Sequence, residues 1–212
     1  MSISAAVRSS RLARMPTRIL LATSNNEKSR EYRELASASE LAIDLLPDFD
    51  KLPSFDESAP TFAENSAGKA LHYCRFTDEI VLADDSGLVV PALGGAPGVH
   101  SARYAGPDAT RAQRVAKLLK QMQGKMGDQR RARFVCVISI ARLGRALAVV
   151  SDCAEGFIAD EPRGTNGFGY DPVFYFPDRS HTYAEATAQE KNFASHRGKA
   201  FRRLVDLLMP RK

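Results

Sequence analysis

The 212-residue chain contains only three cysteines, Cys74, Cys136 and Cys153, and none of them forms a C-x-x-C pair. Three scattered thiols support neither a disulfide framework nor a structural zinc site. We therefore expect reduced, mostly packed thiols in a cytoplasmic protein.

Long hydrophobic runs are missing as well. The longest apolar region, residues 134–150, is interrupted by Arg142, Gly144 and Arg145 and is too short to cross a bilayer. No membrane association is expected. Because 44% of the residues are hydrophobic, the chain can still bury a core, as one large domain or as two lobes built on one sheet.

The positive charge is small and unevenly distributed. Lysine and arginine number 30 against 25 acids, a formal net charge of +5. Four basic residues lie in the first eighteen positions, which hold no acid: Arg8, Arg11, Arg14 and Arg18. The rest of the chain is nearly neutral, so stable nucleic-acid binding is not expected. Residues 1–16 lack the apolar core of a secretory signal and are predicted to be a flexible tail before a single domain at residues 17–212.

Apolar strands alternate with amphipathic helices, which is typical of an α/β protein. Strands are predicted at residues 18–23, 43–46, 80–84, 88–90, 157–158 and 173–176, with two more on either side of a turn at Leu143-Gly144. Helices are predicted from Glu27 to Ser37, from the cap Thr61 to about Phe76, from a cap at Asp108 or Thr110 to about Met122, and at the C-terminus to near Leu208.

The loop after the first strand lacks both common nucleotide-binding patterns, G-x-x-x-x-G-K-[ST] and G-x-G-x-x-G. It nevertheless joins a buried strand to a helix whose first N–H groups have no partner within the helix, and such groups bind anions. The candidate phosphate-binding residues are Thr23, Ser24, Asn25, Asn26, Glu27 and Lys28. Asparagine and serine also occur in such loops simply as helix caps, and this alternative stays open.

Two neighbouring carboxylates, Asp84 and Asp85, end the apolar run at residues 80–82. Adjacent acids repel and resist burial, so they indicate a site for a cation or for proton transfer. Successive strand residues point to opposite faces, and we expect a turn at Ser86-Gly87 to bring both acids into one site. Oxygen ligands favour Mg²⁺ over zinc, and the acid less committed to metal can take a proton from water. Turn-forming aspartates are the alternative.

Further candidates lie on the second predicted helix and in a glycine-rich loop. Glu64 is either a metal ligand or a capping-box residue, and Lys69 is either a phosphate clamp or a surface charge. In the run at residues 164–172, Phe168 can stack on a base and Asp171 can bond to sugar or base. A tight turn with core aromatics explains the same run without a ligand.

The C-terminal region contains an arginine that faces the same way as the core residues, Arg197. An inward arginine needs a partner. Lys191 lies about 120° further round the same helical wheel, so one unbroken helix would not aim both side chains at a common ligand. We predict that a new helix begins with Ser195 as its cap, which places His196 and Arg197 at the ligand. A core histidine beside a salt-bridged arginine is the alternative.

Taken together, motifs distributed between Arg18 and Leu208 resemble those of the inosine/xanthosine triphosphate pyrophosphatases, which act on non-standard purine nucleotides. The motifs are Thr23–Lys28, Phe62–Asn65 followed by Lys69-Ala70, Ala83–Leu88, Pro97-Gly98 with Ser101–Tyr104, Gly167–Pro172 and Ser195–Arg197. The resemblance implies an α/β fold with an elongated mixed β-sheet flanked by helices, two lobes around a central nucleotide cleft, and a homodimer.

The same resemblance implies a role for each candidate residue. Glu64, Asp84 and Asp85 would hold Mg²⁺, and Asp85 would be the catalytic proton acceptor. The substrate would be bound by Thr23, Ser24, Asn25, Asn26, Glu27, Lys28, Lys69, Ser86, Phe168, Gly169, Tyr170, Asp171, Lys191, His196 and Arg197. The family commonly has glycine where this chain has Glu27. A negative charge beside a triphosphate is unfavourable, so we expect Glu27 to point to solvent.

The implied reaction is Mg-dependent hydrolysis of ITP, dITP or XTP to the monophosphate and pyrophosphate, which cleanses the nucleotide pool. Selectivity would rest on the 6-keto group of the purine, because adenine's amino group leaves buried donors unmatched. Two alternatives are a nucleotide-sensing module without turnover and a nucleic-acid binder that uses the basic tail with Arg130, Arg131 and Arg133. Neither explains the acids at Asp84 and Asp85 as well.

Overall fold

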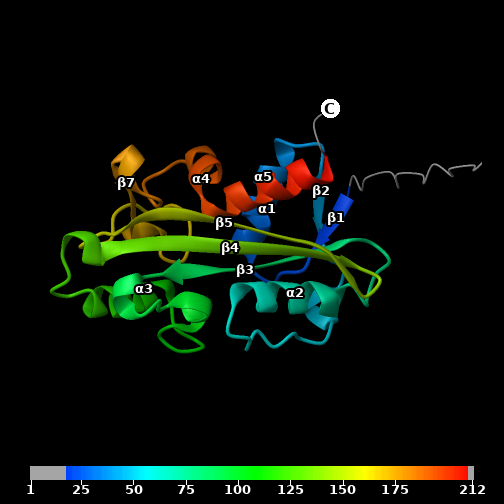
Figure 1. Cartoon of the computed structure of the whole chain (residues 1–212), viewed down its shortest axis with the longest axis horizontal. Helices are drawn as coiled ribbons and strands as arrows, with labels where there is room; N and C mark the ends of the chain where they lie inside the picture. The colour runs from blue at the N-terminus through cyan, green and yellow to red at the C-terminus, as the bar shows by residue number, and fades with distance from the viewer. Residues whose placement is uncertain (1–17, 210–212) are drawn as a thin grey trace, which may run out of the picture.

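The computed structural model describes residues 18–209, so the tail predicted at residues 1–16 lies outside the described residues. A seven-stranded sheet in the order β2-β1-β3-β4-β5-β6-β7 forms the centre of the molecule (Figure 1). Its strands are β1 Arg18–Leu21, β2 Ala42–Leu45, β3 Val81–Val89, β4 Arg131–Arg142, β5 Arg145–Ile158, β6 Phe174–Phe176 and β7 His181–Thr182. The α-helices are α1 Asn26–Ser37, α2 Phe62–Tyr73, α3 Arg111–Gln121, α4 Ala188–Ala194 and α5 His196–Leu208. Short 3₁₀ helices are η1 Phe49–Lys51, η2 Pro91–Leu93, η3 Gly98–Arg103, η4 Gly127–Arg130, η5 Asp171–Val173 and η6 Pro177–Arg179.

The sheet is mixed. Strand β1 is parallel to β2 and to β3, whereas the strands from β3 to β7 pair antiparallel. The long strands β4 and β5 give the molecule its elongated shape. Their turn lies at Leu143-Gly144, as predicted, and the α/β fold with an elongated mixed sheet is confirmed.

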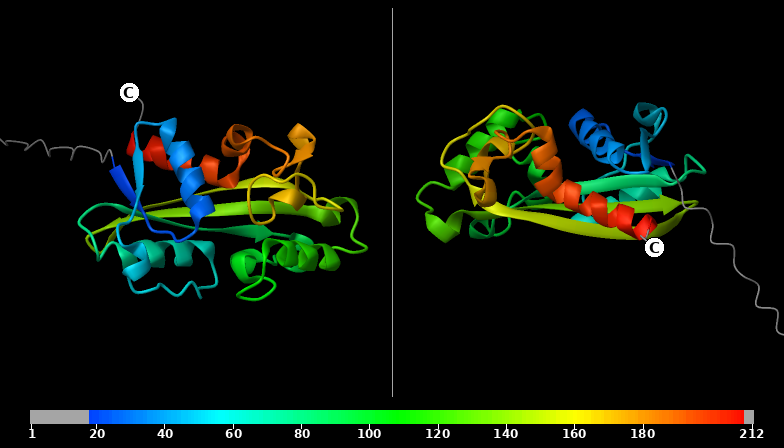
Figure 2. Two further views of the ribbon diagram at one scale, coloured as in Figure 1. Left: turned by 180° about the vertical axis from the view of Figure 1, so that it is seen from behind. Right: turned by 90° about the horizontal axis from the view of Figure 1, so that it is seen from above.

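Helices cover both faces of the sheet. Figure 2 shows α1, α4 and α5 on one face and α2 and α3 on the other. Helix α1 leads from β1 to β2, and α2 leads from β2 back to β3 on the opposite face. This arrangement creates a switch point between β1 and β3, the place where open α/β sheets bind ligands. Strand β1 ends at Leu21, beside Leu82, while β3 continues to Val89, so β3 has a free edge beyond the end of β1.

Three clusters of buried apolar residues form the core of two lobes, one at each end of the sheet. Two clusters sandwich the β1–β3 end of the sheet, one under α1 and α5 around Phe201 and the other under α2 around Tyr73. The third joins α3 to the other end of the sheet around Leu118 and Phe174. Cys74 and Cys136 are buried, Cys153 is half-buried, and all three are free thiols, as expected. Within residues 18–209, no helix has the length and apolar character needed to cross a membrane.

The predicted turn at Ser86-Gly87 is wrong. Strand β3 runs without a break from Val81 to Val89, and Ser86 and Gly87 keep their register with Cys136 and Val135 of β4. A Cβ atom at Gly87 would lie 2.4 Å from the Gly98 carbonyl oxygen. The glycine therefore serves the close approach of η3 to the strand and not a reversal of the chain.

Two smaller differences concern strand ends. Residues Phe157 and Ile158, predicted as a separate strand, continue β5 and pair there with β6. The short strand β7 was not predicted, because two residues carry no periodic signal.

The predicted new helix after Ser195 is confirmed, since α4 ends at Ala194 and α5 begins at His196.

Candidate active site

A cleft of about 440 Å³ opens at the free edge of β3 and gathers residues from most parts of the chain. It is lined by all but three of the predicted site residues: Thr23, Ser24, Asn25, Glu27, Lys28, Lys69, Asp85, Ser86, Phe168, Gly169, Tyr170, Asp171, Lys191, His196 and Arg197. Asn26, Glu64 and Asp84 are not among the lining residues. The structure therefore brings together segments that lie as far apart in the sequence as β1 and α5.

The loop from Thr23 to Lys28 acts as a helix cap and also lines the cleft. The Asn25 side-chain oxygen accepts hydrogen bonds from the N–H groups of Glu27, at 2.9 Å, and Lys28, at 3.1 Å. Glu27 pairs with Arg30 at 2.5 Å, and its side chain is 44% exposed. The expectation that Glu27 points to solvent is thus only partly met, because the residue stands at the rim of the cleft.

Asp84 and Asp85 point to opposite faces of β3, so the expectation that both acids enter one site is wrong. Asp84 lies on the α5 side, where it accepts from Lys28 Nζ at 3.0 Å and from Arg197 Nη2 at 3.2 Å. Burial alone would raise the pKa of Asp84, but the charges of Lys28 and Arg197 outweigh it and hold this pKa well below its usual value.

Asp85 lies on the α2 side and has no cationic hydrogen-bond partner within the described residues. Its carboxylate accepts from Asn65 Nδ2 at 3.0 Å and from the Ser86 N–H at 2.8 Å. Burial raises the pKa of Asp85 to about 6; the charge of Lys28 opposes this rise and that of Glu57 adds to it. A carboxyl group with this pKa is mostly ionised at neutral pH and can still accept a proton.

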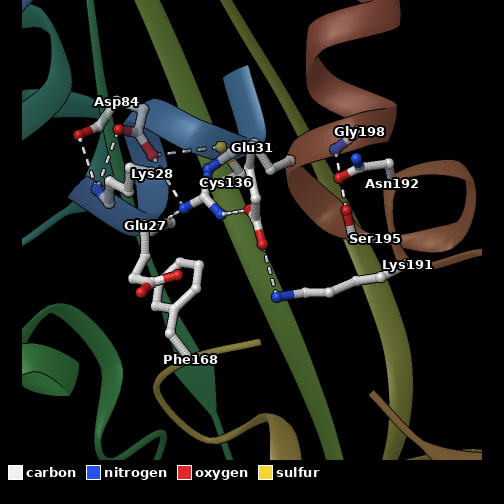
Figure 3. Close-up of polar contacts among 12 residues, drawn as sticks. Glu27, Lys28, Glu31, Asp84, Cys136, Phe168, Lys191, Asn192, Ser195 and Gly198 are labelled. Atoms are coloured by element: carbon white, nitrogen blue, oxygen red, sulfur yellow. Dashed lines mark hydrogen bonds and ion pairs between the residues drawn. The ribbon is translucent and has the colours of Figure 1, made fainter. Parts of the chain in front are cut away.

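Three acids and three bases form a buried charge cluster on the α1/α5 face, and most of them are drawn in Figure 3. Glu31 accepts from Lys191 Nζ at 2.6 Å and from Arg197 Nη1 at 2.5 Å. Lys191 also donates to Asp171 at 2.5 Å. Arg197 donates to the Ser86 hydroxyl oxygen at 2.8 Å in addition to Asp84. The members are Glu31, Asp84, Asp171, Lys28, Lys191 and Arg197.

The break between α4 and α5 lets Lys191 and Arg197 reach the same acid. Ser195 caps α5, because its hydroxyl oxygen accepts from the Gly198 N–H at 3.1 Å. The chain turns there, and both cations contact Glu31, as Figure 3 shows for Lys191. The helix restart predicted at Ser195 is therefore confirmed, and Glu31 and Asp84 are the acidic partners of Arg197.

The aromatic part of the cleft lies against this cluster. Lys191 Nζ lies 4.7 Å and Arg197 Cζ 5.5 Å from the centre of the Phe168 ring. His196 stacks on Phe134 with ring centres 4.7 Å apart. Burial and the neighbouring positive charges lower the pKa of His196 far below its usual value, so its imidazole is neutral.

Glu64 does not line the cleft. Its carboxylate accepts from the Thr61 hydroxyl at 2.6 Å, its N–H donates to the same hydroxyl oxygen at 3.2 Å, and the residue is exposed, so it takes part in capping α2. In the part of the chain that the structure describes, no three histidine, cysteine or acidic side chains gather as a metal-binding set. Glu57 does line the cleft and pairs there with Lys69 at 2.5 Å.

Five charged residues of the cleft or of the buried charge cluster were not predicted from sequence. Glu31 could have been found by the reasoning used for Arg197, because it shares the inward face of α1 with Tyr32 and Leu35. The others are Glu57 in an irregular loop, Arg103 in η3, and Arg111 and Arg114 at the start of α3. These four positions carry no periodic signal that distinguishes them from surface charges.

Comparison with known proteins gives matches over most of the chain. The Ham1 family model matches residues 19–207. A dITP/XTP pyrophosphatase of Geobacillus kaustophilus is 50% identical over 88% of this chain and 91% of its own length. One of Desulfotalea psychrophila is 45% identical over 86% of this chain and 81% of its own.

Solved structures share the fold. A HAM1 protein from Coxiella burnetii has a TM-score of 0.81 and 42% identity, covering 92% of this chain and 99% of that one. A nucleoside-triphosphatase or dITP/XTP pyrophosphatase from Mycobacterium abscessus has a TM-score of 0.69 and 36% identity, covering 90% and 99%. From the extent of these matches, the chain belongs to the Ham1 family.

Proposed function

We propose that the protein hydrolyses non-standard purine nucleoside triphosphates, ITP, dITP and XTP, to the monophosphate and pyrophosphate. The observation that carries this proposal is Asp85, a carboxyl group with a pKa of about 6 in a cleft that also holds lysines and a phosphate-binding type of loop. The relatives named dITP/XTP pyrophosphatase support the same substrate class.

Asp85 is the proposed proton acceptor. Water attacks the α-phosphorus, and the bond from that phosphorus to the oxygen bridging to the β-phosphorus breaks. The water proton passes to Asp85, and intact pyrophosphate leaves. Asn65 holds the carboxylate through its side-chain amide, so the basic oxygen keeps one orientation before substrate arrives.

The donor set fits Mg²⁺ better with Glu57 than with the two other acids predicted as ligands. Asp85 and Glu57 both line the cleft, and Mg²⁺ is commonly held by one or two carboxylates together with substrate phosphates. Asp84 is paired with Lys28 and Arg197, and Glu64 does not line the cleft and bonds to Thr61. When bound, the ion would neutralise phosphate charge and orient the reacting groups.

The triphosphate is proposed to lie along the Thr23–Lys28 loop, toward Lys69. In the described structure, Lys28 pairs with Asp84 and Lys69 with Glu57. Before the substrate binds, these acids keep the two ammonium groups in place. When the substrate binds, each lysine can leave its acid for a phosphate oxygen or contact both. A lysine held in place loses less side-chain entropy on binding.

Base selectivity is proposed to depend on two buried atoms at the start of α5. His196 Nδ1 and Arg197 Nε are buried and have no hydrogen-bond partner among the described residues. Such atoms are rare in folded proteins and are costly unless a ligand satisfies them. The 6-keto oxygen of hypoxanthine or xanthine can accept from a donor here, whereas adenine presents an amino group.

A homodimer, a cytoplasmic location and magnesium as the metal complete the proposal. The dimer and the metal rest on the family resemblance, supported for the metal by the Asp85 and Glu57 carboxylates in the cleft. The location rests on the three free thiols. Sedimentation of the purified protein tests the dimer, and turnover with Mg²⁺ added back after chelation tests the metal.

The decisive test of the reaction uses water labelled with ¹⁸O. Attack at the α-phosphorus puts the label into the monophosphate and leaves the pyrophosphate unlabelled. Label in the pyrophosphate, or release of orthophosphate alone, would overturn the proposed reaction. Running ITP, dITP, XTP, GTP and ATP in parallel tests selectivity, and equal rates for all five would remove the role proposed for the base contacts.

A further inference from the structure

Arg111 joins the two sides of the cleft. It is the first residue of α3, and its guanidinium donates to the Gly167 carbonyl at 3.0 Å and to the Asn166 carbonyl at 3.1 Å. These two carbonyls belong to consecutive residues that directly precede Phe168. The planar fork of an arginine matches such a pair of acceptors, which a single ammonium group does not.

The charge of Arg111 is used differently from that of four other cations in the cleft. Lys28, Lys69, Lys191 and Arg197 each pair with at least one carboxylate. Among residues 18–209, Arg111 has no carboxylate partner, and its hydrogen bonds go to the loop backbone. A charged donor to a neutral carbonyl is a strong hydrogen bond, and here two of them act on one short segment.

Arg111 adds to other hydrogen bonds of the loop around Phe168, in which the Phe168 N–H donates to Asp171 at 2.7 Å and the Asn166 side chain donates to the Ala186 carbonyl at 3.0 Å. Gly167 and Gly169 flank Phe168 with φ angles of 64° and 60°, so the backbone on both sides has little preference of its own. The Asn166 N–H donates to the Ala184 carbonyl at 3.0 Å. For the carbonyls of Asn166 and Gly167, Arg111 is the only donor within the described residues.

Helix α3 is a firm base for this contact. Its start has a complete capping box between Thr110 and Gln113. Val115 and Leu118 are buried in the apolar cluster at that end of the sheet. Because Arg111 lies at the start of this anchored helix, its guanidinium can hold the loop before Phe168 at a fixed distance from α3.

We propose that Arg111 is a positioning residue that holds the Phe168 loop ready to stack on the purine. The inference rests on the proposed function, because it assigns the base to this loop. Arg111 does not contact Asp85, so its loss should weaken substrate binding and leave the chemical step nearly intact. Phe168 already has cationic groups beside its ring, from Lys191 and Arg197, and Arg111 keeps the ring there.

The loop can be observed directly because the chain contains no tryptophan. Phe168→Trp provides a single fluorescent reporter in the nucleotide-free protein. Adding Arg111→Ala to it should lower the tryptophan anisotropy and increase quenching by acrylamide, and Arg111→Lys should give an intermediate result. Arg114→Ala is the charge-matched control, because Arg114 also lines the cleft but donates to Ala109 and not to the loop.

Kinetics in the protein with Phe168 intact gives the second readout. Arg111→Ala should raise KM for ITP about tenfold, with kcat changed by less than about twofold. Unchanged anisotropy and quenching in the reporter protein, or an equal response to Arg114→Ala, would overturn the proposal. A fall in kcat without a change in KM would do the same. If the wild-type chain fails to hydrolyse ITP, the proposed function fails, while the nucleotide-free fluorescence still decides whether Arg111 holds the loop.

Discussion

The two faces of β3 use neighbouring aspartates in opposite ways. On the α1/α5 face, Asp84 is paired with two cations, and its pKa is held low. On the α2 face, Asp85 accepts only neutral hydrogen bonds within the described residues, and its pKa is raised to about 6. Because successive strand residues point to opposite faces of a sheet, a step of one residue separates the structural charge of Asp84 from the reactive carboxyl group of Asp85.

This difference explains why a doubled acid can persist in a buried strand. The Asp84 charge is balanced by Lys28 and Arg197 within the buried cluster, so the free-energy cost of burying it is offset. Asp85 remains under-compensated, which costs stability and supplies a base. The pair is therefore two sites placed back to back, and each can be tested without the other.

The largest expected effect is on turnover by Asp85→Asn. The amide keeps the shape of the side chain but cannot take a proton, so kcat for ITP should fall by about a thousandfold or more. Binding of ITP, measured by calorimetry, should change much less. The stability of the variant should not fall, because a carboxyl group with a raised pKa is disfavoured in its ionised form in the folded state. Turnover within tenfold of wild type would show that another group is the base.

The next effect is on stability and concerns the opposite face. Glu31→Gln removes the acid shared by Lys191 and Arg197, leaving two buried cations under-compensated. Urea unfolding should show a loss of about 3–5 kcal/mol. Glu34→Gln, on the same helix and bonded to Asn192, is the matched control and should change stability by less than about 0.5 kcal/mol. Equal effects for both variants would mean that the cluster does not hold this face together.

Much of this arrangement could be predicted from sequence. Helical geometry alone predicts the helix restart at Ser195 and a partner for the inward-facing Arg197, and both predictions are confirmed. The expected convergence of Asp84 and Asp85 is wrong because Ser86-Gly87 forms no turn. The small size of Gly87 serves a tertiary contact that no local pattern reveals. Glu57 was missed for a related reason: only the folded chain brings its irregular loop to the cleft.

A third prediction concerns pH. Since the base must be ionised, kcat/KM for ITP should fall about tenfold per pH unit below pH 6. The Asn65 hydrogen bond favours the ionised form, so Asn65→Ala should raise the pKa of Asp85 and start the fall at higher pH. Rates measured across pH 5–8 check both statements. If the fall of kcat/KM at low pH does not shift in Asn65→Ala, a group other than Asp85 causes it.

A smaller effect is expected on selectivity. His196→Ala removes one of the two buried polar atoms at the start of α5 that have no hydrogen-bond partner among the described residues, and the ratio of kcat/KM for ITP to that for ATP should fall about tenfold. The comparison is made within one protein preparation, so loss of folded material cancels from the ratio. A ratio equal to that of wild type would assign discrimination to the backbone or to Arg197.

The smallest expected effect sharpens the contrast between cleft and surface acids. Glu64→Gln keeps a hydrogen-bond acceptor for Thr61 and leaves the cleft untouched, so kcat/KM and the Mg²⁺ concentration for half-maximal activity should stay within about twofold of wild type. Glu57→Gln removes a carboxylate that lines the cleft, and the Mg²⁺ requirement should rise about tenfold or more. If the Mg²⁺ requirement rises for Glu64→Gln instead, Glu64 must swing into the cleft when metal and nucleotide bind. The α2 face would then supply its ligands from the helix and not from the loop that precedes it.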